Sequence, residues 1–143
     1  MATSALGRAD RRSRPAVPIH AAASAAYGLG AIALGAEAVV HVQQFASLFH
    51  DVRWIGPLFI ANAVAIAIVL AGLAAARTRV VAALAGVGIS AVALGSLVIS
   101  YGVGLFGWQE AGWRTPTAIA MVAEVSAAVL LAAGLAASAA DRR

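Results

Sequence analysis

Four long apolar segments dominate this chain, at roughly residues 19–44, 55–75, 79–105 and 117–139. A helix needs about 20 consecutive apolar residues to cross a bilayer, and each segment reaches that length. Charged residues make up only 11% of the 143 residues, whereas a typical soluble domain carries about 25%. The sequence therefore predicts an all-α fold, a four-helix transmembrane bundle over residues 18–140 that follows a disordered basic tail over residues 1–17.

The arginines predict the orientation of this bundle. All ten basic residues are arginines, and eight of them fall on one side of a four-span arrangement. Since cytoplasmic loops carry an excess of basic residues, we expect both termini and the middle turn on the cytoplasmic side of a bacterial inner membrane. The net charge of +4 is explained by this topology and does not indicate a nucleic-acid partner. The eight are Arg8, Arg11, Arg12, Arg14, Arg77, Arg79, Arg142 and Arg143, and the other two are Arg53 and Arg114.

A cleaved signal peptide ending at the "AEA" of residues 36–38 is the alternative for the N-terminal segment. The apolar run before that site is longer than the roughly 7–15 residues of a typical signal peptide, so we favour a permanent first span.

Polar residues interrupt the apolar segments at one common depth. Glu37, His41 and Gln44 are spaced i, i+4 and i+7, so they share one face of the first helix. The second and fourth helices each carry one polar side chain about two turns below the outer surface, which at about 1.5 Å per residue is roughly 10–13 Å. The third helix, which runs toward the outer surface, carries two more polar side chains near its outer end, Ser100 and Tyr101. The predicted polar layer comprises Glu37, His41, Gln44, Asn62, Ser100, Tyr101 and Glu124.

Stripes of small residues predict how the helices pack. Small side chains allow helix backbones to approach closely in lipid, where apolar area alone does not drive association. We therefore expect a compact bundle in which both buried glutamates turn inward. The stripes are Ser24, Gly28, Ala31 and Gly35 on the first helix, and Gly88, Ala91, Gly95 and Gly102 on the third.

The two membrane-embedded glutamates, Glu37 and Glu124, need partners. A charged group at the centre of a membrane helix costs at least about 2.5–3.5 kcal/mol. Candidate partners are the imidazolium of His41, Arg53 or Arg114 reaching down from the rim, or a shared proton. Two interpretations remain open: protonated carboxyl groups that only link helices by hydrogen bonds, or a site for a proton, ligand or substrate.

A metal site is a third interpretation of the same layer. Glu37, His41 and Glu124 offer one imidazole and two carboxylates, which suit zinc, copper or iron. The chain has no cysteine, no second histidine within the membrane and no known ligand motif, so the sequence predicts no cofactor and leaves a metal undecided. A b-type haem is disfavoured because the three later segments contain no histidine for a second axial position.

Two outer segments, "FHDVRWIGPLF" and "GLFGWQEAGWRTP", are rich in aromatic and charged residues. Tryptophan favours membrane interfaces, so the simpler interpretation is a pair of anchoring turns. Glu110 and Arg114, four residues apart, would pair on a short interfacial helix. The alternative is a lid or docking surface over the polar layer. Its candidate residues are His50, Asp51, Arg53, Trp54, Trp108, Glu110, Trp113 and Arg114.

The stretches "FHDVRWIGPLFIANAVA" and "GLFGWQEAGW…AMVAEVSAAVLL" resemble small four-helix integral membrane proteins of actinobacteria that carry no assigned function. In those proteins an aromatic residue and an arginine precede an Ile-Gly-Pro-Leu-Phe helix start, here Ile55 to Phe59, with an asparagine that corresponds to Asn62. A Gly-Leu-Phe-Gly stretch with a glutamate, here Glu110, precedes a last helix with its own glutamate, here Glu124. The resemblance covers the first, second and fourth helices with their outer loops. It implies a bacterial membrane location and no mechanism.

More loosely, the chain is similar to small multidrug-resistance transporters, which also have four helices and a glutamate in the first. It differs from them in its second buried glutamate, Glu124, and in lacking aromatic residues at mid-membrane that would enclose a cation.

The sequence predicts no enzyme, because it contains no nucleophile elbow, phosphate-binding loop or dinucleotide fingerprint. We expect a non-enzymatic accessory or binding subunit whose polar layer and outer loops engage a partner complex or a small ligand. Its partners would be the lipid bilayer and either other membrane subunits or a second copy of the chain. The alternative is a proton-coupled transporter of small molecules or ions that acts as a homodimer, with Glu37 and Glu124 alternately protonated.

Overall fold

The computed structural model describes residues 19–142, which form an all-helical bundle. The helices are α1 (Ile19–Gln44), α2 (Ile55–Ala74), α3 (Arg79–Gly102) and α4 (Thr115–Ala140). A π-helical segment, η1 (Phe45–Phe49), continues α1 without a break. All four helices are long and apolar enough to cross a membrane, and they confirm the four predicted helices close to their predicted bounds. The predicted basic tail, residues 1–17, lies outside the described residues.

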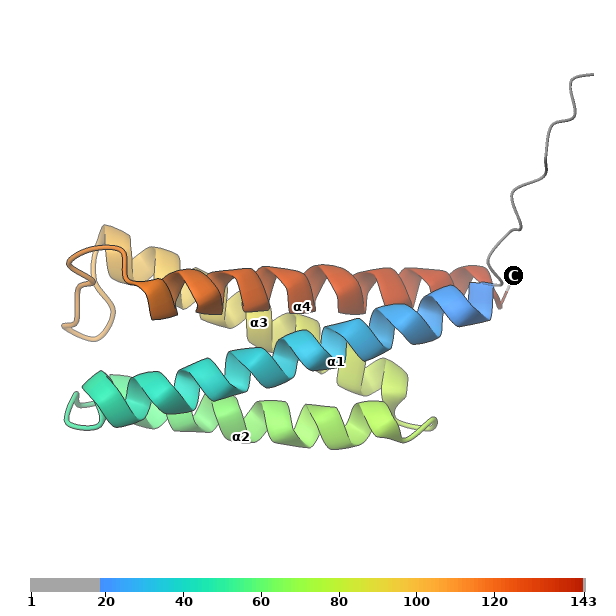
Figure 1. Cartoon of the computed structure of the whole chain (residues 1–143), viewed down its shortest axis with the longest axis horizontal. Coiled ribbons are helices and arrows are strands. Elements are labelled where there is room, and N and C mark those ends of the chain that lie inside the picture. Colours follow the sequence, from blue (N-terminus) through green and yellow to red (C-terminus); the bar gives the residue numbers. More distant parts are fainter. Residues whose placement is uncertain (1–18, 143) are drawn as a thin grey trace, which may run out of the picture.

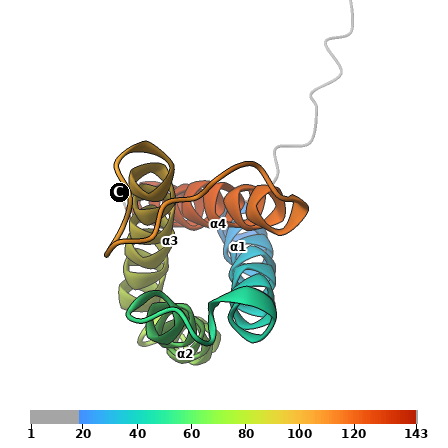
Figure 2. The same ribbon diagram turned by 90° about the vertical axis from the view of Figure 1, so that its left-hand side faces the viewer.

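The helices run alternately up and down and lie around a ring, in which α1 contacts α2 and α4, and α3 contacts the same two helices (Figures 1 and 2). The interface between α1 and α4 is the most extensive. One end of the bundle, here called the loop end, carries residues 45–54 and 103–114 (Figure 1). The opposite end, the turn end, carries the short turn 75–78 and the end of α4.

A tightly packed apolar core fills the part of the bundle nearer the turn end. Its centre is Leu131 of α4, which is fully buried. The Leu131 side chain occupies the space that Gly30 and Gly86 leave open, since a Cβ at either glycine would lie within 3.0 Å of its methyl groups. The cluster comprises Tyr27, Leu34, Ile66, Val69, Leu73, Ala82, Ala83, Ala127 and Leu131.

The predicted stripes of small residues do not mediate this packing, so that expectation was wrong. No atom lies within 4 Å of a Cβ built at Gly28 or Gly35 of α1, or at Gly95 of α3. The close approaches occur instead at Gly30, Gly72, Gly86 and Gly134. The buried face of α1 follows the helical repeat that runs through the large core side chains and Glu37. This repeat leaves Ser24 and Gly28 exposed, and Ala31 and Gly35 half-buried. Large apolar side chains, among them Ile32, Ile68, Val98 and Val129, also lie exposed on that surface, as expected where lipid is the solvent.

Candidate functional site

A buried polar layer crosses the bundle between the apolar core and the loop end. Glu37 of α1 is fully buried, and Glu124 of α4 is only 3% exposed. The Asn62 Nδ2 atom of α2 lies 3.4 Å from Glu37 Oε1 and 3.4 Å from His41 Nε2. His41 Nε2 in turn lies 3.9 Å from Glu124 Oε1. The structure thus brings together four of the residues that the sequence placed at one depth, from three different helices.

The His41 ring is held in one orientation. Its Nδ1 atom lies 2.9 Å from the backbone carbonyl oxygen of Glu37. A carbonyl oxygen can only accept, so Nδ1 carries a proton and donates it. The ring also stacks at a tilt on Phe59, with 4.9 Å between the ring centroids. These two contacts direct Nε2 toward Asn62 and Glu124.

The third helix contributes Ser90, which the sequence analysis did not single out. The fully buried Ser90 hydroxyl donates to Glu37 Oε2 at 2.8 Å. Glu37 and Ser90 each lie twelve residues before the loop-end terminus of their helix, at Phe49 and Gly102 respectively. Because η1 extends the first helix beyond Gln44, Glu37 lies farther from the loop end of its helix than expected. It therefore contacts Ser90 of α3 rather than Ser100 or Tyr101. Counting from the true end of the first helix would have found it.

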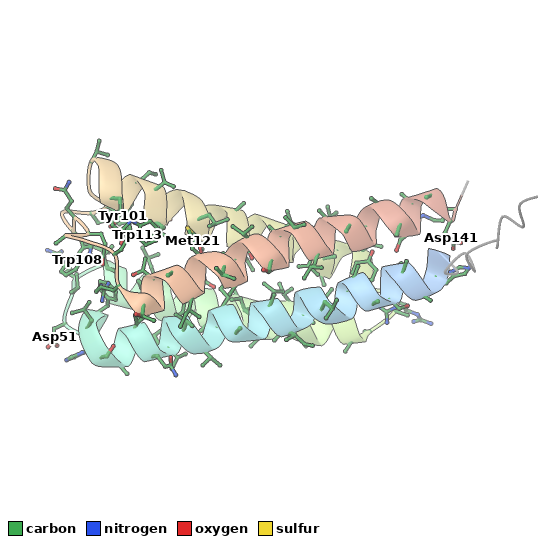
Figure 3. The ribbon with its side chains drawn as sticks, turned by 45° about the horizontal axis from the view of Figure 1, so that its top comes forward. Asp51, Tyr101, Trp108, Trp113, Met121 and Asp141 are labelled. Atoms are coloured by element: carbon green, nitrogen blue, oxygen red, sulfur yellow. The ribbon has the colours of Figure 1, made fainter. Side chains whose placement is uncertain are left out.

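Tyr101, by contrast, does not belong to the polar layer. Its hydroxyl donates to the Gly112 carbonyl oxygen at 3.0 Å, and its ring stacks on Trp113 with 5.2 Å between centroids. Figure 3 shows both rings at the loop end. Gln44 and Ser100 are buried and line the cavity described next, above the layer itself.

A cavity of about 570 Å³ extends from the polar layer to the loop end, between α2 and α3. His41, Asn62 and Glu124 line it at the level of the layer, and most of its remaining wall is apolar. Gly88 and Val92 of α3 also line it and lie exposed on the surface of the bundle. The cavity therefore opens sideways between α2 and α3, where a membrane would place lipid acyl chains.

The segment 103–114 closes the loop end of the cavity. Glu110 accepts hydrogen bonds from Trp108 Nε1 at 3.0 Å and from Arg114 Nε at 2.8 Å. The Arg114 guanidinium lies 5.6 Å from the ring centroid of Phe49, which is 2% exposed and stacks on Phe59 at 4.6 Å. The expected pair of Glu110 and Arg114 does form, although the segment is not helical. We call Phe49, Trp108, Glu110 and Arg114 the cap, and all four line the cavity.

The other loop residues of interest do not line the cavity. His50 Nε2 pairs with Asp51 Oδ2 at 2.9 Å, and both side chains are exposed. The Arg53 guanidinium lies over the Trp54 ring, 5.0 Å from its centroid. Trp113 is 63% exposed. These five residues form local surface pairs and do not contact the polar layer.

Two atoms of the layer are buried without a hydrogen-bond partner, Asn62 Oδ1 and Glu124 Oε2. In the described part of the chain no arginine forms an ion pair or hydrogen bond with either carboxyl group of the layer. Ligand atoms of Glu37, His41 and Glu124 all lie within 4.8 Å of one another. The layer therefore contains polar atoms that could bind a proton, a cation or the polar group of a ligand.

No protein-family model matches the chain, and no characterised protein or solved structure matches it either. The site is interpreted below from its own chemistry.

Proposed function

We propose that this protein is a non-enzymatic binding subunit of a bacterial inner membrane, which holds a small amphipathic ligand in its cavity. The observation that carries this proposal is the cavity itself, which has largely apolar walls and ends at His41, Asn62 and Glu124. Ligand sites in proteins combine mostly apolar linings with a few convergent polar groups that orient the ligand. Here the apolar part of the ligand would lie along α2 and α3, and its polar head would meet the polar layer.

The sideways opening supports entry from the membrane. Gly88 and Val92 are exposed at the opening, on a surface that is apolar enough to face lipid. The cap covers the loop end, so the path between α2 and α3 is the more open one. A ligand that partitions into the bilayer can follow this path without crossing water.

The distribution of arginines supports an orientation with the turn end in the cytoplasm. Arg77 and Arg79 lie in the turn 75–78 and at the start of α3, and Arg142 follows α4, so all three belong to the turn end. Arg53 and Arg114 lie in the two segments of the loop end, and basic residues favour the cytoplasmic side. The cavity would then open into the outer leaflet. The resemblance to actinobacterial membrane proteins supports a bacterial location for this arrangement.

The test is native mass spectrometry of the protein extracted gently from its own membranes. Gly88→Leu fills the cavity opening, because Gly88 lines the cavity and has no atom near its Cβ position. Gly95→Leu is the matched control, because Gly95 lies on the same helix with equally open space and does not line the cavity. We expect a bound molecule of constant mass on the wild type and on Gly95→Leu, and its loss from Gly88→Leu. A bare wild-type chain, or an adduct that Gly88→Leu retains, would contradict the proposal.

The same spectra test the accessory role. Reproducible heteromeric partners would support a subunit that serves a larger complex. A chain that is found only alone or as a homodimer would contradict that part of the proposal.

The alternative function, a proton-coupled transporter that acts as a homodimer, is favoured by one observation. Glu37 and Glu124 lie in one buried layer beside an open cavity, and Glu124 Oε2 has no partner. Two such carboxyl groups can exchange protons with a substrate. In liposomes, a transporter would lose pH-dependent flux on Glu124→Gln substitution while it remains folded, whereas a binding subunit would show no such flux at all.

A further inference from the structure

We propose that Glu37, His41 and Glu124 bind a divalent transition-metal ion at the inner end of the cavity. This inference deepens the proposed function and rests on it in one respect, since both place the polar head of the ligand at this layer. The ion would occupy the space between α1 and α4 and leave one position open toward the cavity. An oxygen atom of the ligand would complete its coordination.

The distances fit a single ion. The three ligand atoms lie within 4.8 Å of one another, and His41 Nε2 lies 3.9 Å from Glu124 Oε1. With metal–ligand bonds of about 2.0–2.2 Å in a tetrahedral arrangement, two ligands of one ion lie about 3.3–3.6 Å apart. Rotation of the Glu37 and Glu124 carboxyl groups, which moves their oxygen atoms by up to about 1.5 Å, closes the difference.

The surroundings of the ligands provide an independent observation. A histidine that binds metal usually donates its other ring N–H to a carbonyl or carboxylate, which fixes the tautomer and exposes the lone pair. His41 Nδ1 donates to the Glu37 carbonyl oxygen at 2.9 Å, so Nε2 is the free ligand atom. Ser90 donates to Glu37 Oε2 at 2.8 Å and orients that carboxyl group in the same way.

Asn62 offers a fourth protein ligand, which together with the oxygen atom of the bound molecule would make the ion five-coordinate. Its Nδ2 atom lies 3.4 Å from both Glu37 Oε1 and His41 Nε2, and both distances are long for hydrogen bonds. Its Oδ1 atom is buried without a partner. Half a turn of the amide exchanges the two atoms and directs Oδ1 at the space between the ligands.

Charge also favours a divalent cation. Two carboxylates share the layer, Glu124 Oε2 is buried without a partner, and no arginine in the described part of the chain pairs with them. One divalent ion neutralises both carboxylates. One imidazole with carboxylate and amide oxygens suits zinc, iron(II) or manganese(II), and the absence of cysteine argues against copper(I).

The experiment is zinc titration of chelator-treated protein in nanodiscs by calorimetry, repeated with cobalt(II) as a spectroscopic probe of the ligand field. His41→Ala and Glu124→Gln are compared with His50→Ala and Asp51→Asn, the matched changes in an exposed histidine–carboxylate pair. We expect one ion per wild-type chain, at least tenfold weaker binding in the two layer variants, and unchanged binding in the two controls. Absence of a stoichiometric ion, or equal weakening in layer and control variants, would overturn the inference.

Two further measurements keep the outcome clear. If the layer variants do not fold, Ser90→Ala replaces them, because loss of an outer hydrogen bond weakens metal binding by about 10–100-fold while the ligands stay in place. The molecule detected by native mass spectrometry is measured separately, before and after chelation. An amphipathic adduct without zinc uptake refutes the metal site alone, and zinc uptake without an adduct refutes the ligand proposal alone.

Discussion

The hydrogen bond between Ser90 and Glu37 offers the sharpest stability test of the polar layer. Ser90→Ala removes a donor that lies 2.8 Å from Glu37 Oε2, and both side chains are fully buried. The substitution leaves the size of the side chain almost unchanged. Its effect on the free energy of unfolding therefore reports mainly the lost hydrogen bond.

The structure sets the expected magnitude. Hydrogen bonds between membrane helices contribute about 0.6 kcal/mol on average and about 1.7 kcal/mol at most. Complete burial and the short distance place this bond in the upper half of that range, so we expect Ser90→Ala to cost about 1–1.7 kcal/mol. An ionised Glu37 would raise the cost to about 1.5–3 kcal/mol, because hydrogen bonds to charged groups are stronger.

The assay is reversible unfolding in mixed micelles, arranged as a double-mutant cycle of Ser90→Ala with Glu37→Leu, because leucine leaves no acceptor for the Ser90 hydroxyl. Ser96→Ala is the matched control on the same helix, because its hydroxyl has no hydrogen-bond partner within the described residues. We expect a coupling energy of at least about 0.6 kcal/mol between Ser90 and Glu37. Additive effects within about 0.3–0.5 kcal/mol would refute direct contact between the two residues.

Two further predictions concern the core and the cap. Gly86→Ala places a Cβ 2.6 Å from Leu131 Cδ1 in a fully packed region, so it should destabilise the bundle by about 1–3 kcal/mol. Gly95→Ala meets no atom within 4 Å and should be neutral or stabilise the helix by up to about 1 kcal/mol; equal effects of the two substitutions in the same unfolding assay would contradict the packing. Glu110→Gln removes the charge that holds Arg114, so hydrogen exchange should become faster in residues 103–114 and stay constant at the turn end. Unchanged exchange in that segment would show that the pair does not hold the cap.

The sequence predicts the four helices, and it predicts that their polar residues lie at one depth. Both predictions depend only on the number of residues along each apolar segment. Apolar length defines the spans, and a rise of about 1.5 Å per residue places Glu37, Asn62 and Glu124 near one level. The buried residues of α4, among them Thr117 and Glu124, also repeat on one side of the helix.

The π-helical extension of the first helix and the contact of Glu37 with Ser90 depend on tertiary contacts, which the periodicity of the sequence does not predict. The π-helical segment η1 brings Phe49 inward against Phe59, and a Cβ at Gly56 would collide with the Phe49 carbonyl oxygen. The same π-helical segment extends the first helix to Phe49, and Glu37 then lies at the level of Ser90. Small residues gave a misleading signal, because glycine is equally acceptable in a close contact, as at Gly86, and on a lipid-facing surface.

The most direct test of the polar layer is solid-state NMR of His41 in lipid bilayers. The chain has three histidines, so His20→Gln with His50→Gln leaves a single imidazole that is labelled with nitrogen-15. We expect a proton on Nδ1, together with through-space contacts from Nε2 to the side chains of Glu124 and Asn62. An unprotonated Nδ1, or an Nε2 without contact to either side chain, would contradict the layer on which both the ligand site and the metal site depend.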